Sequence, residues 1–319
     1  SGPATYSDYP PTEQGRGMMP MQITRLSAAL GAEIRGVDLD EVTGDDVSTI
    51  TTLLLEHLVL FFPDQRLTLD GHVALGRRFG DLEIHPNLPN AGPAHPEVLE
   101  LRATRGGVAD EWHTDVTFLP SPSVMSIMHM VTCPELGGDT MWANQYLAYE
   151  RLSAPLRDLV DGLHAVHNAS PHRKPEMTAM HPVVRVHPET GRRSLMVNEH
   201  FTKRIAELSH PESQMLLDYL ARWSTGDEFS VRYRWSPGTV AIWDNRCTQH
   251  RVIHDFEGER VIQRVTVLGD RPEGAEGRWE PFATERFGAT SVHDDILRNH
   301  LREQVHGLAS ADDRTTGRR

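Results

Sequence analysis

His113 and Asp115 are separated by one residue in the segment EWHTDVTF, which continues into a β-favouring stretch. Residues i and i+2 of a strand share a face, so this imidazole and carboxylate can hold one metal ion. A third ligand must come from elsewhere, and His250 follows the strand-like segment TVAIWDN. Two neutral imidazoles and one carboxylate leave adjacent positions of an octahedral ion open, as in non-haem iron oxygenases. These residues predict an iron(II) site that can also take a chelating 2-oxoacid and O₂.

The His-x-Asp or His-x-Glu spacing is common in this chain, so it is a weak signal by itself. Three of its other occurrences have proline in the middle, and a fourth lies in a predicted helix, where residues i and i+2 diverge. These pairs are His95/Glu97, His187/Glu189, His210/Glu212 and His293/Asp295. Two alternatives stay open on the residues alone: ordinary structural histidines, and a zinc hydrolase or non-catalytic metal-binding jelly roll.

Two arginines after His250 have the chemistry to hold anions. Arg260 follows His250 by ten residues and Arg264 follows four residues later, on the same strand face by the period of two. A guanidinium binds a carboxylate or sulfo group through two parallel hydrogen bonds. A buried charge of this kind is costly unless an anion meets it. The pair predicts an anion site near the metal, unless both side chains point outward to solvent.

The segments that must position these residues contain many short strands and few helices. Apolar runs and alternation predict strands, while the 3.6-residue period and capping residues predict helices. We expect helices over residues 44–58, 69–79, 145–163 (with a break at Pro155) and 210–223. We expect strands over 58–62 and 123–134, a strand or hairpin over 21–39, and hairpins over 181–198, 230–245 and 251–269. This pattern predicts a mainly β fold with peripheral helices, a jelly roll.

Composition limits the partners. The 319 residues carry a formal net charge of −13, which argues against nucleic acid or an anionic membrane as the partner. No apolar run is long enough to span a membrane, and the first residues lack the apolar stretch of a signal peptide. The two cysteines, Cys133 and Cys247, predict no disulfide framework and a reduced, cytoplasmic location.

The ends of the chain differ in composition from its middle. Residues 1–20 are rich in proline, glycine and hydroxyl residues and are expected to be a disordered arm. We expect a single domain over 21–307, with a helix near 293–307, and a disordered tail over 308–319.

Six linked motifs resemble those of the taurine dioxygenase-like branch of the Fe(II)/2-oxoglutarate dioxygenases. The resemblance extends from about residue 23 to residue 270, and within it the motifs follow in this order: WHTDVTFLPSP, GGDTMWAN, HPVVRVHPETG, VNEHFTKRI, WDNRCTQH and ERVIQRVTVLGD. The resemblance implies a double-stranded β-helix (jelly roll) with helices packed outside. It also implies an enzyme that uses Fe(II), 2-oxoglutarate and O₂ to hydroxylate a small organic anion, releasing succinate and CO₂. Relatives often form dimers or tetramers, so we expect a homo-oligomer.

Position by position, the resemblance implies roles for five residues. His113, Asp115 and His250 match the iron ligands. Arg260 matches the residue that pairs with the distal carboxylate of 2-oxoglutarate, and Thr140 matches a hydroxyl that helps to hold it. Halogenating relatives lack the carboxylate ligand, so the presence of Asp115 favours hydroxylation.

On the substrate side the resemblance is partial. His85 and Arg264 match residues that bind the sulfonate in taurine dioxygenases, and Phe201 matches an aromatic wall. Leu88 replaces a tyrosine, and Ala109 replaces an asparagine near the substrate amine. A buried hydrogen bond from such an asparagine contributes about 1–3 kcal/mol, so we expect taurine to bind weakly. The expected substrate is a sulfonate, an alkyl sulfate or a carboxylate such as an aryloxyalkanoate. Sulfite or sulfate leaves where the hydroxylated carbon bears that group.

Further residues are expected to shape the site, to pack in the core or to lie outside the resemblance. Residues 168–180, NASPHRKPEMTAM, form a lid segment that is shorter than in taurine enzymes, and basic. Trp112 and Trp243 are expected to be packing walls, and Cys247 a small core residue. Residues 271–319 lie beyond the matched segment.

Overall fold

The computed structural model describes residues 21–105 and 109–282. The arm predicted at 1–20, the helix expected near 293–307 and the tail predicted at 308–319 lie outside these residues. Within the described part of the chain, no helix is long and apolar enough to cross a membrane.

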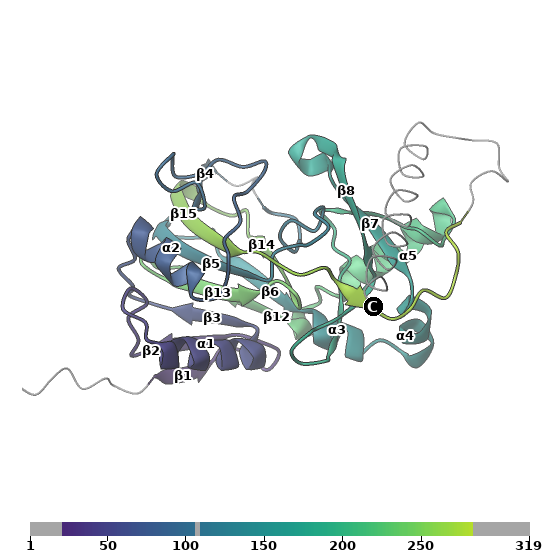
Figure 1. The fold of residues 1–319 in the computed structure, drawn as a ribbon, viewed down its shortest axis with the longest axis horizontal. Helices are drawn as coiled ribbons and strands as arrows, with labels where there is room; N and C mark the ends of the chain where they lie inside the picture. Colours follow the sequence, from purple (N-terminus) through teal and green to yellow (C-terminus); the bar gives the residue numbers. More distant parts are fainter. Residues whose placement is uncertain (1–20, 106–108, 283–319) are drawn as a thin grey trace, which may run out of the picture.

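Seven strands form the largest sheet (Figure 1). In spatial order they are β1 (Gln22–Arg25), β2 (Ala32–Arg35), β3 (Val59–Phe62), β13 (Val240–Asp244), β5 (Met125–Thr132), β15 (Glu257–Val267) and β4 (Leu99–Arg105). Neighbours pair antiparallel except β2 and β3, which run parallel. Strands from both halves of the chain therefore meet at the centre of this sheet.

The two faces of the large sheet pack against different partners. Successive side chains of a strand point to opposite faces, which explains why β3, with the sequence VLFF, is apolar throughout. On one face, Phe62 shares a core with α1 (Gly44–His57) and α2 (Leu69–Arg77). On the other face, Phe61 lies in a second core, with its ring 5.2 Å from that of Trp142. The large sheet is thus the middle layer between helices and a second sheet.

The second sheet and two smaller sheets complete the fold. The second sheet consists of β12 (Ser230–Tyr233), β6 (Thr140–Asn144) and β14 (Thr248–Val252). The smaller sheets contain β11 (Thr202–Ile205), β7 (His164–Ala169) and β8 (Lys174–Pro182), and β10 (Arg193–Leu195), β9 (Val184–Val186) and β16 (Glu273–Gly274). Facing sheets, antiparallel except for the β2–β3 pair, with helices outside form the predicted jelly roll.

The remaining helices are short, apart from α5. They are α3 (Gln145–Glu150), α4 (Ala154–Val160), α5 (His210–Trp223) and the 3₁₀ turns η1 (Ser170–His172) and η2 (Asp227–Phe229). The predicted break in the helix over 145–163 is confirmed, because α3 and α4 are separate. Pro155 lies in the first turn of α4, where its missing N–H leaves no helical hydrogen bond unmade.

Two of the predicted hairpins are wrong. β12 and β13 flank the turn at SPG, but β12 pairs with β6, while β13 pairs with β3 and β5. β14 and β15 likewise separate, because β14 pairs with β6 and β15 with β4 and β5. A turn between two strands favours a hairpin locally, but closure of the jelly roll sends each strand to a different sheet. The hairpins over 21–39 and 181–198 are confirmed.

The expected lid segment is largely a β-hairpin. β7 and β8 pair antiparallel, and η1 lies at the tip between them. In Figure 1 this hairpin projects beyond the neighbouring strands. The lid region of this chain therefore has a regular backbone rather than a long loop.

Candidate active site

His113, Asp115 and His250 lie together and are buried. Their ligand atoms are all within 4.8 Å of one another. His113 Nε2 is 4.0 Å and His250 Nε2 is 3.8 Å from the same atom, Asp115 Oδ1. Within residues 21–105 and 109–282 no other cluster of His, Cys, Asp or Glu side chains has this geometry. The other His-x-Asp/Glu pairs in that part of the chain therefore do not form a comparable site, and His293/Asp295 lies outside it.

The backbone itself sets the distance between the two imidazoles. His113 N donates to His250 O (3.1 Å), and His250 N donates to His113 O (2.8 Å). Their ring centroids are 4.2 Å apart. The prediction of a strand around His113 and Asp115 is wrong, however. His113 forms only an isolated bridge, with His250, and a turn follows it.

A strained turn directs Asp115 toward the imidazoles. The next residue, Val116, has a φ of 47°. This left-handed conformation costs a β-branched residue about 1–3 kcal/mol. Thr117 anchors the turn, because its Oγ1 lies 3.1 Å from His167 Nδ1 and accepts from Asn198 Nδ2 (3.3 Å). Buried hydrogen bonds thus hold the turn that spacing alone could not predict.

A chain of buried hydrogen bonds supports Asp115 from behind. Ser126 Oγ donates to Asp115 Oδ2 (2.8 Å), and Asn245 Nδ2 donates to Ser126 Oγ (3.0 Å). Trp243 Nε1 donates to Asn245 Oδ1 (2.9 Å). Because Ser126 binds Oδ2, Asp115 presents Oδ1 to the imidazoles. Outer hydrogen bonds of this kind orient metal ligands.

The protonation states of the three residues suit a divalent metal. Burial lowers the pKa of His113 to about 4 and that of His250 well below its ordinary value. Burial alone would raise the pKa of Asp115, but the charge of Arg264, aided by the hydrogen bond from Ser126, brings it below its usual range. His113 Nδ1 donates to Glu111 O (2.8 Å), which leaves its Nε2 lone pair facing the site. Neutral imidazoles and an ionised carboxylate are the forms that bind metal, so this donor set fits Fe(II).

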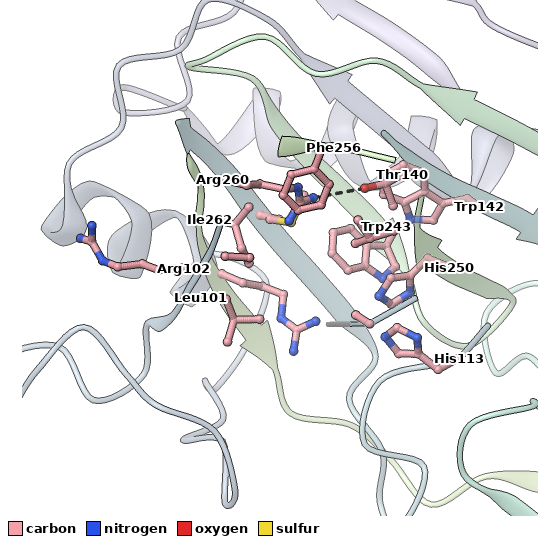
Figure 2. Close-up of a pocket in the computed structure, with 15 residues that line it drawn as sticks. Leu101, Arg102, His113, Thr140, Trp142, Trp243, His250, Phe256, Arg260 and Ile262 are labelled. Carbon is pink, nitrogen blue, oxygen red and sulfur yellow. Dashed lines mark hydrogen bonds between the residues drawn. The ribbon is translucent and has the colours of Figure 1, made fainter. Parts of the chain in front are cut away.

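A cavity extends from the imidazoles to Arg260 and contains about 710 Å³ of space free of protein atoms, open solvent at its mouth included. In Figure 2 the rings of His113 and His250 lie at one end, and Arg260 and Thr140 lie at the other. The rest of the lining is mostly apolar: Leu101, Ala103, Ala109, Met128, Trp142, Trp243, Val252, Phe256 and Ile262. The cavity thus has a metal-binding end and a cationic end separated by apolar walls.

Arg260 is a buried cation held by neutral groups. Its Nε donates to Gly138 O (3.3 Å), and its Nη2 donates to Thr140 Oγ1 (3.5 Å, dashed in Figure 2). Within the described residues no carboxylate lies within ion-pair distance of it. Burial lowers the pKa of Arg260 to about 10, so the side chain stays charged at neutral pH. A buried charge without a counter-ion is costly, so this end of the cavity favours an anion.

The turn at GGDT shapes this cationic end. Gly138 has a φ of 69°, a left-handed conformation that glycine adopts without steric cost. It places the Gly138 carbonyl and the Thr140 hydroxyl on the same guanidinium. Trp235 Nε1 also donates to Thr140 Oγ1 (2.9 Å), which fixes the hydroxyl.

Arg264 lines the cavity and also contacts one of the metal-binding residues, Asp115. Arg260 and Arg264 are only 7% and 8% exposed, so the alternative in which both point to solvent is wrong. Arg264 Nη1 donates to Asp115 Oδ1 (2.7 Å), while its buried Nε has no hydrogen-bond partner. The period of two thus places both guanidinium groups and Ile262 on the cavity face of β15.

His85 is half-buried near Arg264. Its Nδ1 accepts from Asn87 N and Leu88 N, both at 3.1 Å, so the ring proton of the neutral imidazole is on Nε2. Burial, followed by the charge of Arg264, lowers the pKa of His85 to about 3. His85 is therefore a neutral donor through Nε2.

The other expected substrate residues differ in whether they line the cavity. Ala109 lines the cavity. Phe201 is buried, with its ring centroid 6.3 Å from that of His113. Leu88 is half-buried beside His85 and is not part of the cavity lining.

Sequence reasoning missed several residues of the site. Ser126, Asn245 and Trp235 act through hydrogen bonds between segments far apart in the chain, and no local pattern marks them. His172 and His200 complete a group of rings with Phe201. The signal for His172 was present, because it is the one histidine inside the lid segment NASPHRKPEMTAM.

Comparisons with known proteins agree with this geometry. Residues 22–266 match the family model described as "Taurine catabolism dioxygenase TauD, TfdA family". The chain is 37% identical to an alkylsulfatase of Acinetobacter baylyi, over 94% of this chain and 98% of that protein. It is 38% identical to an alpha-ketoglutarate-dependent sulfate ester dioxygenase of Pseudomonas putida, over 81% of this chain and 93% of that protein. A crystal structure of a taurine dioxygenase from Burkholderia xenovorans is 42% identical, with a TM-score of 0.73 over 81% of this chain and 94% of that one. The chain belongs to the TauD/TfdA family of taurine catabolism dioxygenases.

Proposed function

We propose that the protein uses Fe(II), 2-oxoglutarate and O₂ to hydroxylate a small organic anion that carries a sulfate or sulfonate group. The observation that carries this proposal is the pair of buried guanidinium groups, Arg260 and Arg264, on the face of β15 that lines the cavity next to the metal-binding residues. Membership of a dioxygenase family favours this function over a zinc hydrolase or a non-catalytic jelly roll. The cosubstrate would give Arg260 the counter-ion that it lacks, and the substrate would meet the Nε of Arg264, which has no partner although Nη1 is paired with Asp115.

The first cation has the surroundings expected for 2-oxoglutarate. Arg260 and Thr140 would hold the distal carboxylate, while His113, Asp115 and His250 would hold the iron that the 2-oxoacid end chelates. Bound iron supplies the activation of O₂ that the protein side chains lack. The apolar walls between the two ends would exclude water from the bound cosubstrate.

The second cation is assigned to the substrate. Arg264 has a buried Nε without a partner, and His85 offers an Nε2–H donor. Together they would orient the anionic group so that the neighbouring C–H bond faces the metal. Ala109 in the cavity wall and the half-buried Leu88 leave apolar surface for an alkyl chain, which suits an alkyl sulfate better than taurine.

The chemistry balances for a primary alkyl sulfate. Hydroxylation of the carbon next to the ester oxygen gives an unstable product, whose C–O bond to sulfate breaks as the new hydroxyl loses its proton. The overall change converts alkyl sulfate, O₂ and 2-oxoglutarate into aldehyde, hydrogensulfate, succinate and CO₂. The same step on a sulfonate releases sulfite. The relatives named as an alkylsulfatase and a sulfate ester dioxygenase support the sulfate version.

An anaerobic titration tests the proposal. Fe(II) and 2-oxoglutarate are added to the full chain, and the weak visible metal-to-ligand charge-transfer band is recorded. Hexyl sulfate, taurine and an aryloxyalkanoate are then titrated separately. We expect a band that shifts with hexyl sulfate at the lowest concentration, and release of succinate, sulfate and hexanal in equal amounts once air is admitted.

Two other results of this titration would contradict parts of the proposal. A band that responds only to the aryloxyalkanoate would keep the dioxygenase and replace its substrate. Tight metal binding without any band would contradict the assignment of Arg260 and Thr140 to 2-oxoglutarate.

Two properties remain predictions. We propose a homo-oligomer, a dimer or tetramer, which the mass of the particle in solution by light scattering would test. We also propose a cytoplasmic location, in keeping with Cys133 and Cys247, which are both free. Cell fractionation would test this.

A further inference from the structure

The tip of the β7–β8 hairpin brings a second imidazole to the substrate side of the site. His172 ends the 3₁₀ turn η1 at this tip and is half-buried. Its ring centroid is 5.8 Å from that of His85, 5.5 Å from Phe118 and 5.4 Å from Phe201. The hairpin thus contributes a polar ring to an otherwise aromatic wall.

Asn87 links the two imidazoles. Its backbone N–H donates to His85 Nδ1 (3.1 Å), and its side-chain Nδ2 lies 3.5 Å from His172 Nδ1 and 3.4 Å from Met177 Sδ. With the amide nitrogen as donor, His172 accepts through Nδ1, just as His85 does. Both rings then carry their proton on Nε2 and present a neutral donor. The contact with Met177 ties Asn87 to the hairpin.

The surroundings of His172 leave this donor available. The pKa of His172 is lowered, mainly by burial and then by the charges of His200 and Arg264. The ring is therefore neutral at neutral pH. Within the described residues no carboxylate forms an ion pair with it. His200, the other imidazole nearby, differs because its Nδ1 is paired with Glu111 (2.7 Å).

We propose that His172 is a specificity-determining residue that binds the head group of the substrate together with His85 and Arg264, and selects a sulfo group over a carboxylate. This inference rests on the proposed function, because it names a further ligand of the same anion. The three donors come from three separate elements: β15, the segment before Asn87 and the hairpin tip. An anion bound among them would therefore accept hydrogen bonds from more than one side. The three terminal oxygens of a sulfate or sulfonate point to three sides, whereas a carboxylate accepts only in its own plane.

The test compares head groups on one alkyl chain. Wild type, His172→Phe, His172→Gln and the control His210→Gln are assayed with hexyl sulfate, hexanesulfonate and heptanoate. His172→Phe keeps a ring against Phe118 and Phe201 but loses the donor, while His172→Gln keeps an N–H. His210 is exposed at the start of α5. KM and kcat are measured by succinate release, and affinity by calorimetry without O₂ on the Mn(II)–2-oxoglutarate protein.

Wild type should prefer the two sulfo compounds. His172→Phe should raise KM and the dissociation constant for both by about ten-fold, the loss of one hydrogen bond to a charged group, with kcat little changed. Heptanoate binding should change less, so the preference for sulfo over carboxylate falls. His172→Gln should recover most of the affinity, and His210→Gln should match wild type.

Two outcomes would overturn the inference while leaving the proposed function intact. One is an unchanged preference in His172→Phe with normal thermal unfolding. The other is an equal loss for all three head groups, which would mean that the ring only shapes the wall. A wild type that binds none of the three compounds would instead refute the proposed function itself.

Discussion

Arg264 and Asp115, 149 residues apart in the sequence, form a buried ion pair with Nη1 and Oδ1 2.7 Å apart. The same carboxylate oxygen faces both imidazoles of the metal-binding group. The proposed anion-binding cation and the proposed metal ligand therefore act directly on each other. Substitution of either residue is expected to affect both sites and the stability of the fold.

A double-mutant cycle on this pair should show strong coupling. Asp115→Ala leaves Arg264 buried without a counter-charge, so we expect a loss of about 3–5 kcal/mol in the free energy of unfolding. Adding Arg264→Met should recover part of that loss, because the orphaned charge is removed. Urea denaturation of the metal-free variants measures this. Asp158→Ala, which breaks a surface pair with Arg278 (2.9 Å), should cost less than about 1 kcal/mol.

Asp115→Ala should also abolish coupled turnover. Additive effects in the cycle would contradict the pairing, and surviving turnover in the single variant would contradict the assignment of Asp115 as a metal ligand.

Replacing Arg260 should weaken 2-oxoglutarate binding selectively. Arg260→Met removes a charge-assisted contact of about 2–5 kcal/mol, so the KM for 2-oxoglutarate should rise at least about thirty-fold. Thr140→Val should have a smaller effect, about five-fold, because the hydroxyl is neutral. Arg102→Met on neighbouring β4 is the control: Arg102 belongs to the cavity lining, but its side chain is 63% exposed and its guanidinium points away from the other lining residues (Figure 2). An equal rise in the KM for 2-oxoglutarate in Arg260→Met and Arg102→Met would mean that the net positive charge matters, rather than a specific contact with Arg260.

Ser126 should affect metal affinity without touching the metal. Ser126→Ala removes the donor to Asp115 Oδ2, and loss of such an outer hydrogen bond weakens metal binding about 10- to 100-fold. Anaerobic Mn(II) titration followed by electron paramagnetic resonance measures this directly. Ser230→Ala, whose hydroxyl donates to Gly226 O far along the chain, should bind Mn(II) as wild type does. Unchanged affinity in Ser126→Ala would mean that the turn at Val116 is sufficient to hold the carboxylate.

The metal-free protein should lose stability as pH falls from about 6.5 to about 4. Burial lowers the pKa of His72, His113 and His181 to about 4 each. The unfolded chain, with histidine pKa values near 6.5, then binds more protons than the folded chain throughout this window. The free energy of unfolding must therefore rise with pH across it. The lowered pKa values of Asp115 and Asp244 act only below the window, near the unfolded value of 3.8.

Urea denaturation at several pH values checks this dependence. His72→Gln keeps a donor for Ile127 O but removes one titrating group, so the slope should become shallower. His210→Gln, at an exposed position, should leave the slope unchanged. A slope of the opposite sign would contradict the burial of these neutral imidazoles.

Much of the fold could be read from local pattern. The run LVLFF predicted a strand buried on both faces, and β3 packs Phe61 and Phe62 into two different cores. Pro155 predicted a break, and it lies in the first turn of α4, which begins at Ala154. These predictions succeeded because side-chain period, capping and proline geometry act within a few residues of one another.

The errors in the fold came from pairing between distant segments. The turns after β12 and β14 have hairpin-like sequences, yet each pair of strands separates into two sheets. Which strands pair depends on which apolar faces bury each other, and that is a property of the whole chain rather than of a turn.

The sequence by itself determined the chemistry available to this protein: His113, Asp115, His250 and two arginines on one strand face. These residues could be predicted because residue type and the period of two can be read within a single segment. Only the tertiary structure decided that Arg264 meets Asp115, that Ser126 supports the carboxylate and that the ring of His172 lies beside that of His85. Each of those contacts joins strands or turns far apart in sequence, so its energy depends on burial and geometry that exist only once the sheets have closed.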